Sequence, residues 1–198
     1  MNNEILIATK NDGKLKEFKQ IFEQKGIVVK SLKDINDDVE IVENGLSFEE
    51  NARLKADGYA KSIGIPVLAD DSGLEIDALN GRPGIFSARY AGDHNDAANN
   101  AKVLSELGGI PDEKRTATFH SSVVVRKPDG SELVANGNLR GRILPVPRGD
   151  NGFGYDPLFF VEAKNKTLAE MTREEKNKIS HRALAIEDLL VNFDKFWE

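Results

Sequence analysis

Two adjacent aspartates, Asp70 and Asp71, interrupt the apolar segment "IPVLADDSGLEIDAL" (residues 65–79). The pattern predicts an apolar strand, an acidic turn and a second strand. Carboxylates beside an apolar strand cost free energy unless their charge is compensated. Mg²⁺ is one such partner, because it takes one or two carboxylates with water and phosphate oxygens; an Asx-turn or a helix cap is the alternative. Since neighbouring side chains of a strand point to opposite faces, the two aspartates should have different roles.

The segment "TKNDGK" (residues 9–14) has the residue types of an anion-binding turn. It follows an apolar run and opens a helical pattern, so backbone N–H groups and the helix dipole favour an anion there. Thr9 and Asn11 add neutral hydrogen-bonding groups, and Lys14 adds a positive charge. The segment does not match the Walker pattern, so an ordinary strand–helix turn with a solvated lysine is an equally good interpretation.

Further charged residues lie close to a predicted helix over residues 48–62. Glu43 is a carboxylate just before this helix, and Asn51 and Lys55 lie four residues apart within it. A spacing of four places two side chains on one helix face. Lys55 could therefore reach a phosphate if that face borders a ligand, although each of these residues taken alone is typical of a solvated surface.

The glycine-rich stretch "GDNGFGYDPLFF" (residues 149–160) carries two aromatic rings, Phe153 and Tyr155. One interpretation is a loop that brings a flat ligand between the rings. The other is a turn that enters a strand, with Pro157 preventing a helix. Stacking on these rings would hold a base without selecting it, because every base has a π-face.

The C-terminal segment "EEKNKISHRALA" (residues 174–185) contains Lys176, His181 and Arg182. Imidazole and guanidinium groups can donate hydrogen bonds to carbonyl oxygens of a base. An isolated His-Arg pair is nevertheless usually a surface feature. His120 sits in the alternating segment "TATFHSS" and is interpreted as a structural histidine with its own hydrogen-bond partners.

The remaining patterns predict alternating helices and strands. Strands are expected at residues 4–9, 27–32, 65–79 and 158–161, and in a hairpin over 116–137 that turns at Pro128-Asp129-Gly130. Helices are expected at 14–26, 48–62 and 95–107, and in a last region after residue 172, with capping boxes at Ser47/Glu50 and Thr172/Glu175. The class is therefore α/β or mixed α+β, because the long hairpin disfavours a wholly parallel sheet.

The composition is that of a globular protein, expected to form a single domain over residues 1–198. A net charge of −6 argues against a protein held mainly by a nucleic-acid polymer or an anionic membrane, but not against a small phosphorylated ligand. The absence of cysteine excludes disulfides and thiolate chemistry. No apolar run approaches the roughly 18 residues of a membrane span, and the N-terminus lacks a signal-peptide pattern, so a cytoplasmic location is expected.

Segments along almost the whole chain together resemble the inosine triphosphate pyrophosphatase family, the purine nucleotide hydrolases of the Ham1 type. They are "ATKNDGKLKEF", "SFEENARLKA", "ADDSGLEIDALNGRPGIFSARYAG", "GDNGFGYDPLFF" and "TREEKNKISHRALA". The resemblance implies that ITP, dITP and XTP are hydrolysed to the monophosphate and pyrophosphate with Mg²⁺. It also implies a homodimer and an elongated mixed sheet with flanking helices, in which two lobes surround a central cleft.

The resemblance also implies roles for individual residues. Asp71 matches the catalytic acidic position, which accepts a proton and associates with metal, and Glu43 matches a second metal-associated carboxylate. The residues that would hold the triphosphate are Thr9, Lys10, Asn11, Asp12, Gly13 and Lys14, joined by Lys55. The other substrate contacts would be Ser72, Phe153, Gly154, Tyr155, Asp156, Lys176, His181 and Arg182. Within this set, His181 and Arg182 would select the base by donating to the purine 6-oxygen.

Two positions depart from the family pattern. Lys10 stands where a small or neutral residue is common, and Val42 precedes Glu43 where many relatives have a second glutamate. The second departure leaves a single carboxylate at this position. The alternative functions are a Maf-type nucleotide pyrophosphatase acting on pyrimidine or modified triphosphates, a nucleotide sensor without turnover, and a phosphatase that releases orthophosphate.

Overall fold

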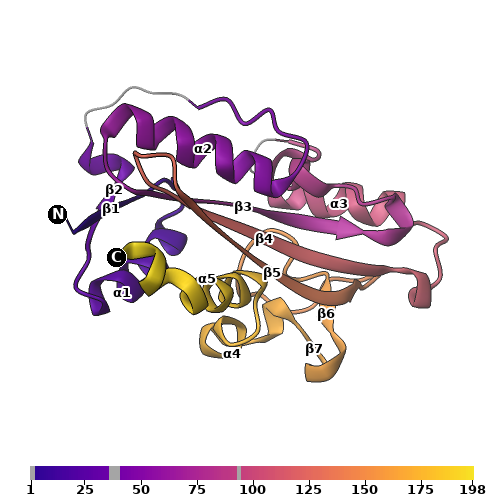
Figure 1. The fold of residues 1–198 in the computed structure, drawn as a ribbon. Coiled ribbons are helices and arrows are strands. Elements are labelled where there is room, and N and C mark those ends of the chain that lie inside the picture. The colour runs from indigo at the N-terminus through magenta and orange to yellow at the C-terminus, as the bar shows by residue number, and fades with distance from the viewer. Residues whose placement is uncertain (1–2, 36–40, 93–94) are drawn as a thin grey trace. The chain divides into compact units, whose positions relative to one another are not determined.

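The computed structural model describes residues 3–35, 41–92 and 95–198 (Figure 1). Its helices are α1 (Asp12–Gln24), α2 (Phe48–Ile63), α3 (Asp96–Glu106), α4 (Arg173–Asn177) and α5 (His181–Trp197). Its strands are β1 (Glu4–Ile7), β2 (Val28–Ser31), β3 (Val67–Ile76), β4 (Thr116–Arg126), β5 (Glu132–Ile143), β6 (Phe159–Val161) and β7 (Lys166–Thr167). The predicted mixed α/β class is confirmed.

The strands form one mixed sheet in the order β2-β1-β3-β4-β5-β6-β7. β1 pairs in parallel with both β2 and β3, whereas β6 pairs antiparallel with β5 and β7. The predicted hairpin is present, because β4 and β5 are neighbours and their connection carries Pro128, Asp129 and Gly130. Within the described residues, no helix has the length and apolar character needed to cross a membrane.

The chain divides into two compact units. Unit 1 comprises Met1–Asp71, Ser122–Ala135 and Asp188–Glu198, and unit 2 comprises Ser72–Ser121 and Asn136–Glu187. The long strands β3, β4 and β5 each contribute residues to both units. Each unit has its own core.

The core of unit 1 follows from the alternation of side chains along its strands. Leu6 and Ala69 are buried with Ala52 and Ala56, small residues that let α2 approach one face of the strands. Figure 1 shows that α1 and α2 lie on opposite faces of the strands β1 and β3. There α1 buries Phe22, whose ring lies 5.0 Å from that of Phe193 in the last part of α5. These contacts hold α1 and α2 on the strands of unit 1.

The core of unit 2 surrounds Phe159, whose ring centroid lies 4.7 Å from that of Phe119. Leu74, Leu158 and other buried apolar residues complete the same cluster. Gly137 of β5 allows the start of α5 to pack closely, since a Cβ there would lie 2.0 Å from the main-chain oxygen of His181. The first turn of α5 is thereby held on the sheet.

Three details of the sequence prediction are wrong. Residues 65–79 contain no acidic turn, because β3 runs without interruption from Val67 to Ile76 through both aspartates. The strand expected at residues 158–161 begins one residue later, at Phe159 of β6. The capping box of Thr172 and Glu175 is present, but it opens only the short helix α4. A separate helix α5 then begins at His181, and the hydroxyl of Ser180 accepts the amide N–H of Ala183.

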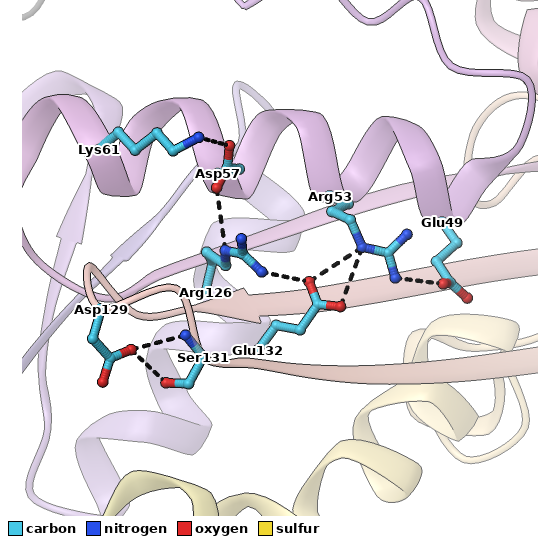
Figure 2. Close-up of polar contacts among 8 residues, drawn as sticks. All are labelled: Glu49, Arg53, Asp57, Lys61, Arg126, Asp129, Ser131 and Glu132. Atoms are coloured by element: carbon cyan, nitrogen blue, oxygen red, sulfur yellow. Dashed lines mark hydrogen bonds and ion pairs between the residues drawn. The ribbon is translucent and has the colours of Figure 1, made fainter.

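Ion pairs connect α2 to the tip of the β4–β5 hairpin within unit 1 (Figure 2). Arg53 donates to Glu49 at 2.7 Å and to Glu132 at 3.1 Å. Arg126 donates to the same Glu132 at 2.9 Å and to Asp57 at 3.2 Å. Glu132 therefore joins two arginines, one from the helix and one from the hairpin.

Candidate active site

The turn that was predicted to bind phosphate is shaped by its own side chains. The Thr9 hydroxyl accepts the N–H of Asn11 at 3.2 Å, and the Asn11 side chain accepts the N–H of Lys14 at 3.0 Å. Asn11 is therefore the N-cap of α1, which begins at Asp12, two residues earlier than predicted. Lys10, Asn11, Asp12 and Gly13 are exposed, so the turn is accessible to a ligand.

Lys14 links this turn to the first aspartate of β3. Its ammonium donates to the Asp70 carboxylate at 2.6 Å, and the two side chains are 16% and 2% exposed. Burying Asp70 without a cation would be unfavourable, so this contact explains how a charged residue fits in the strand.

The second aspartate is held by α2 on the other side of the strand. Asn51 donates to the Asp71 carboxylate at 3.2 Å, and its own side-chain oxygen accepts the N–H of Gly45 at 2.8 Å. A Cβ at Gly45 would lie 2.8 Å from that same oxygen, so glycine permits the close contact. The two adjacent aspartates thus have different partners, and the prediction that they have different roles stays a prediction.

Lys55 lies one helical turn beyond Asn51 and points to the same region. Its ammonium donates to the main-chain oxygen of Asp70 at 3.0 Å and pairs with Glu43 at 3.1 Å. Asn51 and Lys55 contact neighbouring residues of β3, which agrees with the prediction that they share one helix face. Two lysines, an amide and three carboxylates therefore meet around the middle of β3 within unit 1.

Burial raises the pKa of Asp71 above its ordinary value, and the nearby charge of Glu43 acts in the same direction. Lys55, the hydrogen bond from Asn51 and the charge of Lys14 oppose this rise. A carboxylate with a raised pKa is a better proton acceptor near neutral pH than an exposed aspartate.

The donor set fits a divalent cation that is bound jointly with phosphate. Within residues 3–35, 41–92 and 95–198, there is no group of three or more His, Cys, Asp or Glu that would enclose a metal. Mg²⁺ needs no such group, because it is commonly held by one or two carboxylates plus substrate phosphates. Glu43 and Asp71 supply that number of carboxylates, and each repels the other's charge unless a cation is present.

In unit 2, the glycine-rich loop presents one aromatic ring rather than two. The ring of Phe153 is 56% exposed, and the ammonium of Lys176 lies 4.8 Å from its centroid. Tyr155 is only 4% exposed, and its hydroxyl donates to the main-chain oxygen of Ser87 at 2.7 Å. The expectation that both rings face a ligand is therefore wrong for Tyr155, because its ring belongs to the core of unit 2.

The glycines of this loop set its geometry. Gly152 and Gly154 have φ values of +78° and +60°, a region that disfavours side chains with a Cβ. A Cβ at Gly152 would also lie 2.0 Å from the carboxylate of Asp156. That carboxylate accepts the N–H of Phe153 at 3.0 Å and the ammonium of Lys176. The loop is thus built around the Asp156 side chain.

The other predicted base contacts are also in unit 2. His181 and Arg182 are each 8% exposed at the start of α5, and the His181 ring stacks on Phe119 at 4.8 Å. Ser72 follows Asp71 in β3 and is partly exposed. His120 contacts Asn138 at 2.6 Å and Glu75 at 2.8 Å, as expected for a structural histidine.

Asp70 and Asn51 stand out in the sequence, but neither was assigned a role in the predicted site. Asp70 anchors Lys14 by its side chain and Lys55 by its main chain, and Asn51 orients Asp71. The available signal was the alternation of a strand, because it assigns the two aspartates to opposite faces and so requires a separate partner for each.

An accessible turn at a helix N-terminus, beside carboxylates paired with lysines, is the arrangement expected of enzymes that act on nucleotide phosphates. The chain belongs to the Ham1 family, whose sequence pattern matches residues 5–192.

Individual relatives agree with this assignment. The dITP/XTP pyrophosphatase of Lactiplantibacillus plantarum is 54% identical over 193 residues, which cover 98% of this chain and 96% of the relative. The dITP/XTP pyrophosphatase of Bacillus subtilis is 54% identical over 187 residues, 94% of each protein. The structure of the Staphylococcus aureus Ham1 protein matches with a TM-score of 0.91 at 43% identity, covering 98% of this chain and 100% of that chain.

Proposed function

We propose that this protein hydrolyses purine nucleoside triphosphates that carry a 6-oxo base, dITP, ITP and XTP among them, to the monophosphate and pyrophosphate. The observation that carries the proposal is the setting of Asp71, a partly buried carboxylate with a raised pKa that Asn51 orients within a lysine-rich site. The relatives named dITP/XTP pyrophosphatase support the same activity.

The reaction is a displacement by water at the α-phosphorus. The water oxygen forms a bond to phosphorus, its proton passes to the Asp71 carboxylate, and the bond from the α-phosphorus to the oxygen bridging to the β-phosphate breaks. The leaving group is pyrophosphate. Asp71 orients the water and accepts its proton, a contribution that is typically worth about 10²–10⁴ in rate.

The triphosphate is stabilised by positive groups of unit 1. Lys14, Lys55 and backbone N–H groups at the start of α1 supply donors that are already oriented by the fold. Lys10 adds charge beside them. Glu43 and Asp71 would hold Mg²⁺, which when bound neutralises charge on the phosphate oxygens.

The base is recognised by residues of unit 2. Phe153 stacks on the purine without selecting it, and Tyr155 supports the loop from the core. His181 and Arg182 donate to the 6-oxygen, so the 6-amino group of adenine would leave these buried donors unpaired. Ser72, Gly154, Asp156 and Lys176 make the remaining contacts.

Hydrolysis of ITP, dITP, XTP, GTP and ATP, with the leaving group identified, tests this function. Release of pyrophosphate from the 6-oxo purines, with ATP disfavoured, is expected. Release of orthophosphate would indicate a phosphatase, a preference for pyrimidine or modified triphosphates would indicate a Maf-type enzyme, and binding without hydrolysis would indicate a sensor.

We also propose a homodimer that acts in the cytoplasm, as the family resemblance implies. Large apolar side chains that are exposed in the single chain, such as Leu46 at 88% and Val191 at 77%, are compatible with a partner surface. Sedimentation equilibrium of the purified protein measures the oligomeric state directly, and a monomer at micromolar concentration would contradict the proposal.

A further inference from the structure

Both backbone polar groups of Gly154, at the centre of the glycine-rich loop, are held by side chains of α3. The N–H of Gly154 donates to the Asp96 carboxylate at 2.7 Å, and its carbonyl oxygen accepts from the Asn100 amide at 2.8 Å. Asn100 also donates to the main-chain oxygen of Asp96 at 2.8 Å. Residues four apart share a helix face, so one turn of α3 holds a single loop residue from both sides.

The cap of α3 does not require these two side chains, although Asp96, as an acidic residue in the first turn, also favours the helix dipole. Asn95 is the N-cap of α3, and its side chain accepts the N–H of Ala98 at 2.9 Å. The Asp96 carboxylate is therefore not needed for the cap. Asparagine is also a weak helix former, so the interior position of Asn100 carries no benefit for α3 by itself.

The residues on both sides of Gly154 are fixed as well. The N–H of Phe153 donates to Asp156 at 3.0 Å, and the hydroxyl of Tyr155 donates to Ser87 at 2.7 Å. The backbone around Phe153 is thus held on each side, yet its ring remains 56% exposed. A loop that is already ordered loses less conformational freedom when a ligand binds.

We infer that Asp96 and Asn100 are positioning residues for base binding. By holding Gly154 they keep the Phe153 ring in one orientation, ready to stack on the purine before the substrate arrives. The inference rests on the proposed function, because it assigns these residues to the recognition of the base rather than of the triphosphate. All the residues concerned belong to unit 2.

Asp96→Ala and Asn100→Ala test the inference, with Asn95→Ala as the matched control at the same end of α3. The KM for XTP should rise about tenfold in each test variant, because a hydrogen bond that organises the site is lost. The kcat should stay within about twofold, since the chemistry takes place at the phosphates. Inhibition by inorganic tripolyphosphate, which has no base, should be unchanged.

A conservative variant and a measurement independent of activity complete the design. Asp96→Asn should restore most of the affinity, because its amide oxygen can still accept the N–H of Gly154. Hydrogen exchange of residues 149–156 should accelerate in Asp96→Ala and remain as in the wild type in Asn95→Ala. The affinity for XMP, measured by calorimetry, should fall in parallel with the rise in KM.

The inference is overturned if exchange accelerates while KM and XMP affinity stay unchanged, or if Asn95→Ala raises KM as much as Asp96→Ala. Unchanged exchange in both test variants would show that α3 does not hold the loop. If the wild type binds XMP but releases no pyrophosphate from XTP, the proposed function fails and the XMP measurement alone decides the role of Asp96 and Asn100. If the wild type binds neither, both proposals fail.

Discussion

The two adjacent aspartates of β3 differ in their electrostatic surroundings. Asp70 is paired with the Lys14 ammonium at 2.6 Å, so its charge is compensated within the folded chain. Asp71 receives a neutral hydrogen bond from Asn51 and has a pKa raised by burial. The folded protein therefore stabilises the charge of Asp70 and disfavours that of Asp71, which is what a structural anchor and a proton acceptor respectively require.

Asp71→Asn should lower the single-turnover rate of XTP hydrolysis by about 10²–10⁴, because the amide cannot accept the proton of the attacking water. Its free energy of unfolding at neutral pH should be equal to that of the wild type or higher, since the variant removes a carboxylate whose charged form is disfavoured by burial. Rapid-quench kinetics and urea denaturation measure the two quantities.

Asp70→Asn is the matched control, and it should lower the free energy of unfolding, which Asp71→Asn should not. It weakens a charge-assisted hydrogen bond to Lys14, so unfolding should require about 1.5–3 kcal/mol less free energy. Near-normal single-turnover chemistry in Asp71→Asn would remove that residue from the mechanism.

Selection of the base is expected to reside in Arg182 rather than in the exposed ring of Phe153. Arg182→Ala should narrow the ratio of kcat/KM for ITP over ATP by about tenfold or more, because a buried donor for the 6-oxygen is lost. Phe153→Ala should weaken both substrates to a similar extent, since stacking on a ring is indifferent to the base. Steady-state kinetics on both nucleotides decide between the roles, and an intact ratio in Arg182→Ala would place base selection elsewhere.

At the scale of elements, the sequence predicts those parts of the fold whose signals are local. The N-cap Ser47 and the hydrophobic spacing of α2 locate this helix to within one residue, and the turn residues around Asp129 locate the hairpin. The continuity of β3 was not predictable in the same way. It depends on Lys14 and Asn51, which compensate Asp70 and Asp71 from two helices distant in sequence.

In the candidate site too, features with local signals are predictable from the sequence, and features that depend on distant contacts are not. The residue types around Lys14, Lys55 and Asp71 are visible in the sequence, but the burial of Tyr155 depends on a hydrogen bond to Ser87, 68 residues away. The break between α4 and α5 has a local signal in the sequence. Ser180 is a favourable N-cap residue, and it caps the first turn of α5.

The ion-pair network between α2 and the β4–β5 hairpin makes a testable contribution to stability (Figure 2). Glu132→Gln should lower the free energy of unfolding by about 1 kcal/mol, because both Arg53 and Arg126 lose a partner at a partly exposed site. The loss should shrink in 1 M salt, where the screening length falls to about 3 Å. Glu113→Gln, at an exposed position in unit 2, serves as a control and should have little effect at either salt concentration.

Acid should weaken this network in a defined direction. Hydrogen bonding to Lys61 lowers the pKa of Asp57 in the folded protein, and the charge of Arg126 acts in the same sense. A lowered folded-state pKa means that the stabilisation is fully present above the unfolded pKa of about 3.9 and is lost as the pH falls through the lower folded value. Asp57→Asn should therefore be less stable than the wild type at pH 6 and approach it below pH ~4. A constant difference down to pH ~3 would show that the charge of Asp57 is not what stabilises the contact.

At the scale of the whole molecule, the two compact units share the strands β3, β4 and β5. Unfolding of either unit would break the hydrogen-bonded ladders of strands that continue into the other. We therefore expect residues 1–198 to unfold as one domain in a single cooperative transition. The single tryptophan, Trp197, lies in unit 1, where its indole donates to Asn3 at 2.9 Å, and it reports on that unit alone.

A second reporter makes this expectation measurable. In the double variant Phe153→Trp, Trp197→Phe, fluorescence reports on unit 2, because the exposed ring position of Phe153 tolerates a larger side chain. Urea unfolding should be followed by fluorescence and by far-UV circular dichroism in both proteins. Within each protein the two transitions should coincide, as two-state unfolding requires. If fluorescence and circular dichroism separate in either protein, the shared strands do not couple the units. The residues that act on the triphosphate and those that act on the base would then belong to independently stable parts of the chain.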